Sequence, residues 1–215
     1  MKGSLFLYSD QIIPENRKLD DRLISCLKNS RPKIAYIASA PDPQRLYFSE
    51  RQRYYQLIGA ELVAYYDENS NFAEKAGWNW SHYDAVHLSG GNTFHFLDWI
   101  RRTGIVSSLK RYANDGGVLI GTSAGALLLS PSIDTAILCG DVNLANIENT
   151  QALALVEFYL WPHFNDRSNK DRVDHLGLPI GSNVLCVPDG AGVALVANEI
   201  ESYGDVTTYI TKAIN

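Results

Sequence analysis

Apolar runs and helical patterns alternate through the first two thirds of the chain. Runs rich in β-branched and aromatic residues predict buried strands, and apolar residues three and four positions apart predict amphipathic helices. The predicted strands cover residues 3–9, 33–40, 60–66, 83–91 and 118–122. The predicted helices cover residues 17–29, 48–59, 92–104 and 105–117. This alternation predicts an α/β fold with a mostly parallel sheet covered by helices on both faces.

The last third of the chain has a different pattern. Short strand-like runs with turn residues between them cover residues 134–141, 152–161, 183–204 and 206–210. One helical pattern, at residues 166–178, interrupts these runs. No segment has the composition of a linker, so we expect residues 1–215 to form a single domain.

A pair of hydroxyl residues between two glycines interrupts the apolar segment VLIGTSAGALLL, residues 118–129. A strand that turns sharply into a helix at the pattern G-x-S-x-G exposes its serine, here Ser123, as a nucleophile. A second glycine turn, SGGN at residues 89–92, follows another predicted strand. Because ligand sites in such folds lie outside the carboxyl ends of the strands, we expect both turns at one functional edge.

A serine nucleophile needs a base, which is usually a histidine held by a carboxylate. His163 follows an apolar strand, where a strand end would deliver it to the functional edge. The other histidines remain alternatives: His87 in a strand, His95 in a helix, and His82 and His175 in polar surroundings. The carboxylate is open among four residues that follow the serine: Asp134, Asp141, Glu148 and Glu157.

Acyl transfer also needs donors for the developing oxyanion. At such a turn one donor is the N–H that follows the nucleophile, here that of Ala124. We expect the second from the glycine turn at residues 90–92, where missing β-carbons allow close approach of the backbone.

Three segments resemble motifs of the S51 serine peptidases, the group of aspartyl dipeptidase E and cyanophycinase. They are LSGGNTFHFL (88–97), GTSAGALLLSPSI (121–133) and LWPHF (160–164), in the same order as in that family. The resemblance spans most of the chain. It implies a three-layer sandwich similar to class I glutamine amidotransferases, of the flavodoxin-like type, with serine where those enzymes carry cysteine.

The resemblance also implies roles for individual residues. It pairs Ser123 with His163, makes Gly91 and Ala124 the oxyanion donors, and places the acid at or near Asp141. The local sequence there, CGDVN, departs from the aspartyl dipeptidase pattern.

A second departure concerns the substrate. Aspartyl dipeptidases have a segment like T-I-R-T-T-N-D after the serine, and its arginine holds the acidic side chain of the substrate. The corresponding segment here is SIDTAILCGD, with Asp134 in place of the arginine. A carboxylate there would repel an N-terminal aspartate. We therefore expect no aspartyl specificity and a preference for neutral or basic residues, with Asn92 and Asp134 as substrate contacts.

Composition narrows the choice of partners and cofactors. The net charge is −5 and the 19 basic residues are scattered, which argues against nucleic acid or an anionic membrane as the main partner. The three cysteines predict free thiols in a reducing cytoplasm. No cluster has the spacing of metal ligands, so we expect no metal and no cofactor. A homodimer is open, because Trp78, Trp80 and Trp99 either line a dimer contact or pack inside.

The predicted function is a serine peptidase of the dipeptidase or exopeptidase type that hydrolyses short peptides. An α/β-hydrolase esterase is disfavoured, because the chain after Ser123 is short and no H-G-G-G motif precedes it. The alternative from another class is a non-catalytic, amidotransferase-like module that binds a small ligand or a partner.

Overall fold

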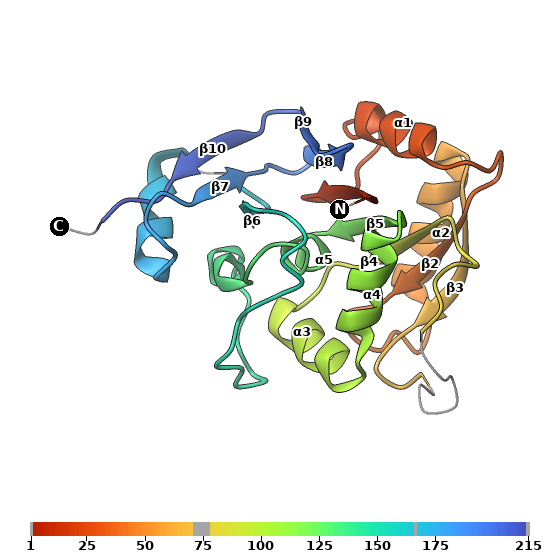
Figure 1. Cartoon of the computed structure of the whole chain (residues 1–215), viewed down its shortest axis with the longest axis horizontal. Helices are drawn as coiled ribbons and strands as arrows, with labels where there is room; N and C mark the ends of the chain where they lie inside the picture. The colour runs from red at the N-terminus through yellow and green to blue at the C-terminus, as the bar shows by residue number, and fades with distance from the viewer. Residues whose placement is uncertain (1, 71–77, 166, 214–215) are drawn as a thin grey trace.

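Strands and helices alternate in the first two thirds of the protein, as the sequence pattern predicts. The structure, a computed structural model, describes residues 2–70, 78–165 and 167–213 (Figure 1). The strands of this part are β1 (Ser4–Tyr8), β2 (Lys33–Ile37), β3 (Glu61–Tyr66), β4 (Ala85–Leu88) and β5 (Val118–Thr122). The helices are α1 (Arg17–Cys26), α2 (Leu46–Ile58), α3 (Thr93–Arg102), α4 (Ile105–Asn114) and the short α5 (Ala124–Leu127).

The central sheet has the order β3-β2-β4-β5-β1-β8-β9. Neighbouring strands from β3 to β1 are parallel. The two strands at the other edge, β8 (Gly192–Val196) and β9 (Glu199–Tyr203), are antiparallel to their neighbours. The prediction of a mostly parallel sheet in an α/β fold is therefore confirmed.

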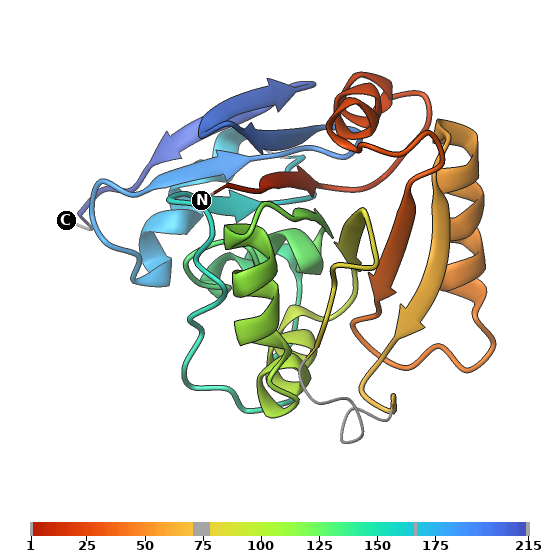
Figure 2. The same ribbon diagram turned by 45° about the vertical axis from the view of Figure 1, so that its right-hand side comes forward.

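Alternate residues of the strands pack into two hydrophobic cores, because successive side chains of a strand point to opposite faces. Leu5 and Leu7 of β1 lie in the core that α3, α4 and α5 cover. Phe6 and Tyr8 lie in the other core, which α1 and α2 cover. Figure 2 shows these two sets of helices on opposite sides of the sheet. The result is a three-layer sandwich in which β1, β4 and β5 are buried on both faces.

The last third adds a second, smaller sheet in the order β10-β7-β6. It consists of β6 (Tyr159–Trp161), β7 (Asn183–Cys186) and β10 (Thr207–Ile210), with β6 parallel and β10 antiparallel to β7. Figure 2 shows these C-terminal strands on the side of the molecule away from α2. Of the run at 152–161, only β6 forms a strand.

Two further predictions for the last third need correction. The strand expected at 134–141 is wrong, because Asp134–Cys139 forms a 3₁₀-helix, η1. The hydroxyl of Thr135 in η1 donates to the carbonyl of Leu160, which ties the turn to β6. The helix expected at 166–178 is a 3₁₀-helix, η2, over Arg167–Leu176, and residue 166 lies outside the described residues.

Two of the three tryptophans considered for a dimer contact pack inside the protein. Trp99 is fully buried and Trp80 nearly so, while Trp78 is half-buried and stacks on Trp80. Within residues 2–70, 78–165 and 167–213, no helix is long and apolar enough to cross a membrane.

Candidate active site

Serines follow four parallel strands where those strands end at one edge of the sheet. Ser9 follows β1, Ser39 lies just after β2, Ser89 follows β4 and Ser123 follows β5. A cleft of about 460 Å³ opens at this edge. Its lining includes Ser39, Ser89 and Ser123, together with the glycine turn after β4 and His163. As expected, both glycine turns lie at one edge of the sheet, beside this cleft.

The backbone at Ser123 turns sharply between β5 and α5. Its φ is 50° and its ψ is −110°, an unusual conformation for a residue with a side chain. The N–H of Ser123 donates to the carbonyl of Tyr8, at 3.0 Å. Gly125 permits the turn, because a β-carbon there would lie 2.0 Å from the carbonyl oxygen of Leu88. The turn therefore leaves the Ser123 hydroxyl at the end of the strand, facing the cleft.

His163 contacts this hydroxyl from the second sheet. It lies two residues after the end of β6, and its Nε2 is 2.8 Å from Oγ of Ser123. The side chain is 38% exposed, so the imidazole faces the cleft and is only partly shielded from water. The structure thus brings together the predicted serine and the predicted histidine.

The carboxylate behind the imidazole belongs to Asp189, which sequence reasoning missed. Oδ1 of Asp189 lies 2.6 Å from Nδ1 of His163, on the side of the ring away from Ser123. Asp189 stands in the loop between β7 and β8, and β7 runs parallel to β6, which precedes His163. A signal was present in the sequence, since VPDG (187–190) is a turn motif inside the strand-like run predicted at 183–204.

The structure therefore corrects the expectation for Asp141. Its carboxylate accepts hydrogen bonds from the N–H of Thr93, at 2.8 Å, and from the Thr93 hydroxyl, at 2.5 Å. The reason is local: η1 replaces the expected strand, and it delivers Asp141 to the start of α3 and not to His163.

Gly91 and Ala124 present backbone N–H groups near Ser123. Gly91 has a φ of 130°, and a β-carbon there would lie 2.0 Å from Oγ of Ser39. The Ser39 hydroxyl donates to the carbonyl of Gly90, at 2.6 Å, and so fixes the turn. Within the described part of the chain, neither of the two N–H groups donates to a protein acceptor.

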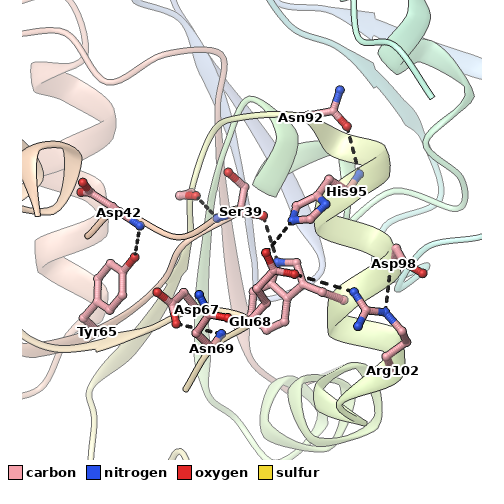
Figure 3. A network of polar contacts seen from close by, with 12 residues as sticks. Ser39, Asp42, Tyr65, Asp67, Glu68, Asn69, Asn92, His95, Asp98 and Arg102 are labelled. Atoms are coloured by element: carbon pink, nitrogen blue, oxygen red, sulfur yellow. Dashed lines mark hydrogen bonds and ion pairs between the residues drawn. The ribbon is translucent and has the colours of Figure 1, made fainter. Parts of the chain in front are cut away.

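Asn92 is among the residues that line the cleft, and its side chain caps α3. Its Oδ1 accepts from the N–H of His95, at 2.9 Å, as Figure 3 shows. Its Nδ2 donates to the carbonyl of Val142, at 3.0 Å. Both ends of the amide thus have structural partners, so the geometry favours a cap over the expected substrate contact.

Comparison with known proteins identifies the family of the chain. The model of peptidase family S51 matches residues 5–201. The chain belongs to peptidase family S51. It is 28% identical over 198 residues to Peptidase E of Nostoc sp., which covers 86% of this chain and 78% of that protein. It is 36% identical over 89 residues to an uncharacterized peptidase of Listeria monocytogenes, which covers 41% and 43% of the two chains.

A solved structure shares the fold. The crystal structure of a peptidase from an acI-B1 actinobacterium superposes with a TM-score of 0.68 and 19% identity, over 100% of this chain and 92% of that one. Family and relatives together support a hydrolase, a serine peptidase of the dipeptidase-like kind.

Asp134, the other expected substrate contact, lies away from the cleft. Asp134 begins η1, and its carboxylate accepts from the hydroxyl of Ser132. It is absent from the described residues that line the cleft. The sequence argument placed Asp134 by matching SIDTAILCGD to the arginine segment of the aspartyl dipeptidases, whereas in the structure this segment forms η1.

The other histidines of the S51 chain have other partners or surroundings. Nε2 of His87 lies 3.0 Å from the Thr122 hydroxyl, and burial holds the pKa of His87 well below its ordinary value, so the ring is neutral. Nε2 of His95 pairs with Glu68 at 3.2 Å, in the network that Figure 3 shows with Arg102 and Asp98. His82 and His175 are exposed.

Charged side chains of both signs border the cleft. Asp10 and Glu50 are at least partly exposed, and Arg51 donates to Oε1 of Gln11, at 3.0 Å. Asp42 is buried and accepts from two N–H groups at the start of α2. Among the described residues, no group of three or more His, Cys, Asp or Glu side chains could hold a metal ion.

Proposed function

We propose that the protein hydrolyses a peptide bond of short peptides through Ser123, His163 and Asp189. One observation carries this proposal. A single line of contacts runs from the Ser123 hydroxyl to Nε2 of His163, at 2.8 Å, and from Nδ1 of His163 to Asp189, at 2.6 Å. The serine end of this line opens into the cleft, and the carboxylate end lies behind the ring.

The geometry assigns one task to each group. Oγ of Ser123, at the tip of a nucleophile elbow, attacks the scissile carbonyl while Nε2 of His163 takes its proton. His163 then gives that proton to the leaving amine, and the same residue activates the water that hydrolyses the acyl-enzyme. Asp189 keeps the proton of the imidazole on Nδ1, so that Nε2 can accept.

The oxyanion would form between two backbone donors. The N–H groups of Gly91 and Ala124 come from the two turns that meet at Ser123. Because these groups already belong to fixed turns, they need no reorganisation when charge develops on the carbonyl oxygen. The helix behind Ala124 is a single turn, so we assign the stabilisation to the two N–H groups themselves.

The cleft suits a short peptide. Its volume of about 460 Å³ is typical of small-molecule sites. A dipeptide carries an ammonium and a carboxylate, and the cleft offers Asp10 and Glu50 for the first and Arg51 for the second. The lack of aspartyl specificity stays a prediction. Repulsion by Asp134 no longer supports it, because Asp134 lies outside the cleft.

The test is hydrolysis of a library of dipeptides and tripeptides by the wild type and by Ser123→Ala in parallel. We expect cleavage by the wild type alone, and the preferred N-terminal residue reports the specificity. Asp-X dipeptides as the best substrates would contradict the expected preference for neutral or basic residues. Peptides that bind to both proteins without cleavage by either would instead support a binding module.

The compartment is part of the same proposal. Cys26, Cys139 and Cys186 are free thiols, and Cys186 is buried. Free thiols persist in a reducing environment, so we propose the cytoplasm as the site of action.

A further inference from the structure

Ser9 holds two members of the proposed catalytic unit with one hydroxyl group. The N–H of His163 donates to Oγ of Ser9, at 2.7 Å. The Ser9 hydroxyl in turn donates to Oδ1 of Asp189, at 3.0 Å. This is the same carboxylate oxygen that lies 2.6 Å from Nδ1 of His163. Ser9, the His163 backbone, the imidazole and Asp189 therefore form a closed ring of contacts.

The direction of each hydrogen bond in this ring is fixed. A backbone N–H can only donate, so the Ser9 oxygen accepts from His163. The single hydroxyl proton of Ser9 is then free to point at the carboxylate, which can only accept when ionised. Ser9 is fully buried, so water does not compete for its oxygen.

The backbone of Ser9 adds a third attachment. Its N–H donates to the carbonyl of Ala191, at 3.2 Å, which anchors the loop that carries Asp189. Asp189 needs such support, because its side chain is 52% exposed and solvent would otherwise share its oxygens. His163 needs it too, because its backbone has a φ of 55° at the end of β6.

We propose that Ser9 is a positioning residue for the proposed reaction, which sets the distance and orientation of Asp189 relative to His163. This inference rests on the proposed peptidase function. Ser9 is absent from the described residues that line the cleft, so it acts through His163 and Asp189 and not on the substrate.

Removing the hydroxyl should change chemistry without changing binding. In Ser9→Ala, the His163 N–H loses its acceptor and Asp189 loses one donor. We expect kcat to fall on the order of 10- to 100-fold, as for other residues that orient a reacting group, with KM unchanged.

The matched control is Ser130→Ala. Ser130 is also fully buried, and among the described residues its hydroxyl has no hydrogen-bond partner. We expect this variant to keep the kcat and the KM of the wild type. Ser9→Cys, which keeps the volume and a weak donor, should fall between wild type and Ser9→Ala. Equal losses in Ser9→Ala and Ser130→Ala, or a raised KM with unchanged kcat, would overturn the proposal.

A second measurement does not depend on turnover. The Nδ1–H resonance of His163 is followed by NMR in Ser123→Ala and in Ser123→Ala combined with Ser9→Ala. We expect this resonance to shift or broaden in the double variant, because Asp189 is no longer held against Nδ1, and an identical resonance in both proteins would overturn the positioning role. If the wild type cleaves no peptide, the proposed function fails, yet this resonance still decides whether Ser9 sets the His163–Asp189 pair.

Discussion

The loops that carry Asp141 and Asp189 show how two carboxylates at one functional edge differ in their partners. Asp189 lies after β7 and contacts the imidazole of His163, at 2.6 Å. Asp141 lies after η1 and accepts from both the N–H and the hydroxyl of Thr93, at the start of α3. The next residue, Val142, accepts from the side chain of Asn92.

The difference suggests that the two loops serve different steps of the proposed reaction, namely proton transfer and stabilisation of the oxyanion. The Asp189 loop contacts His163, the proposed base, and so would support proton transfer. The loop at residues 141–142 contacts residues 92 and 93, directly after Gly91, and so would hold the proposed oxyanion donor in place. Loss of either carboxylate should lower turnover, but direct contact with the base predicts the larger loss for Asp189.

The largest loss of turnover is expected for His163, which Asp189 contacts. His163→Ala removes the base, and we expect kcat to fall on the order of 10⁴- to 10⁶-fold. The measurement is the rate of dipeptide cleavage at saturating substrate. His95→Ala is the control, because His95 pairs with Glu68 and is absent from the described cleft lining. A loss below tenfold in His163→Ala would remove the reason to rank the two carboxylates by their contact with it.

Gly91→Ala tests the half of the site that the Asp141 loop clamps. The added β-carbon would meet Oγ of Ser39 at 2.0 Å, and a φ of 130° disfavours any side chain there. Displacing one oxyanion donor should lower kcat roughly 10²- to 10³-fold. In Gly90→Ala, kcat should fall much less, because the added β-carbon would meet no atom closer than 3.6 Å. Equal losses in both variants would argue against Gly91 as the donor.

A third carboxylate, Asp20, differs from both Asp141 and Asp189, because it is buried and does not line the cleft. It accepts from the hydroxyls of Tyr8 and Tyr54, and burial raises its pKa to about 6. Since its unfolded pKa is lower, the protonated form favours folding, and this stability is lost as pH rises from about 4 through 6. Relative to Asp20→Asn, the wild type should lose roughly 3 kcal/mol at most across this range. Urea unfolding from pH 4 to 7 measures it, and a constant difference between the two proteins would contradict the shift.

The smallest expected effect concerns the stability that Asp141 provides. Asp141→Ala leaves the N–H and hydroxyl of Thr93 without their acceptor, so the free energy of unfolding should fall by about 1 to 2 kcal/mol. Urea unfolding at neutral pH measures this loss. Asp115→Ala, an exposed residue at the end of α4, should change stability by less than about 0.5 kcal/mol. An unchanged free energy of unfolding in Asp141→Ala would mean that the contacts of Asp141 with Thr93 do not stabilise the fold.

Local signals explain which parts of the site were predictable. The sequence points to Ser123 because G-x-S-x-G interrupts an apolar run, and to His163 because it follows a strand. The structure brings these two side chains into contact. Asp189 was missed because the acid was sought between them in the chain, whereas the parallel pairing of β6 and β7 brings it to His163 from beyond. Ser9 carries no local signal at all, since its partners lie 154 and 180 residues away.

In the fold, too, some parts were predictable from local sequence patterns and others were not. The first two thirds were predicted well because continuous apolar runs mark their buried strands, whereas apolar residues three and four positions apart mark their helices. The run at 134–141 was wrong because a short apolar segment does not tell a strand from a helical turn, and the contact of Thr135 with Leu160 decides it. That the chain forms one domain stays a prediction.

The most direct test of the central claim compares kcat/KM of Asp189→Asn and Asp141→Asn for the best dipeptide substrate. Asp189→Asn should keep the shape of the side chain but favour the wrong tautomer of the His163 imidazole. We therefore expect kcat/KM to fall on the order of 10³- to 10⁴-fold. Asp141→Asn keeps an acceptor for Thr93, so we expect a loss of less than about tenfold. The reverse order of the two losses would contradict the account and make Asp141 the carboxylate that serves His163.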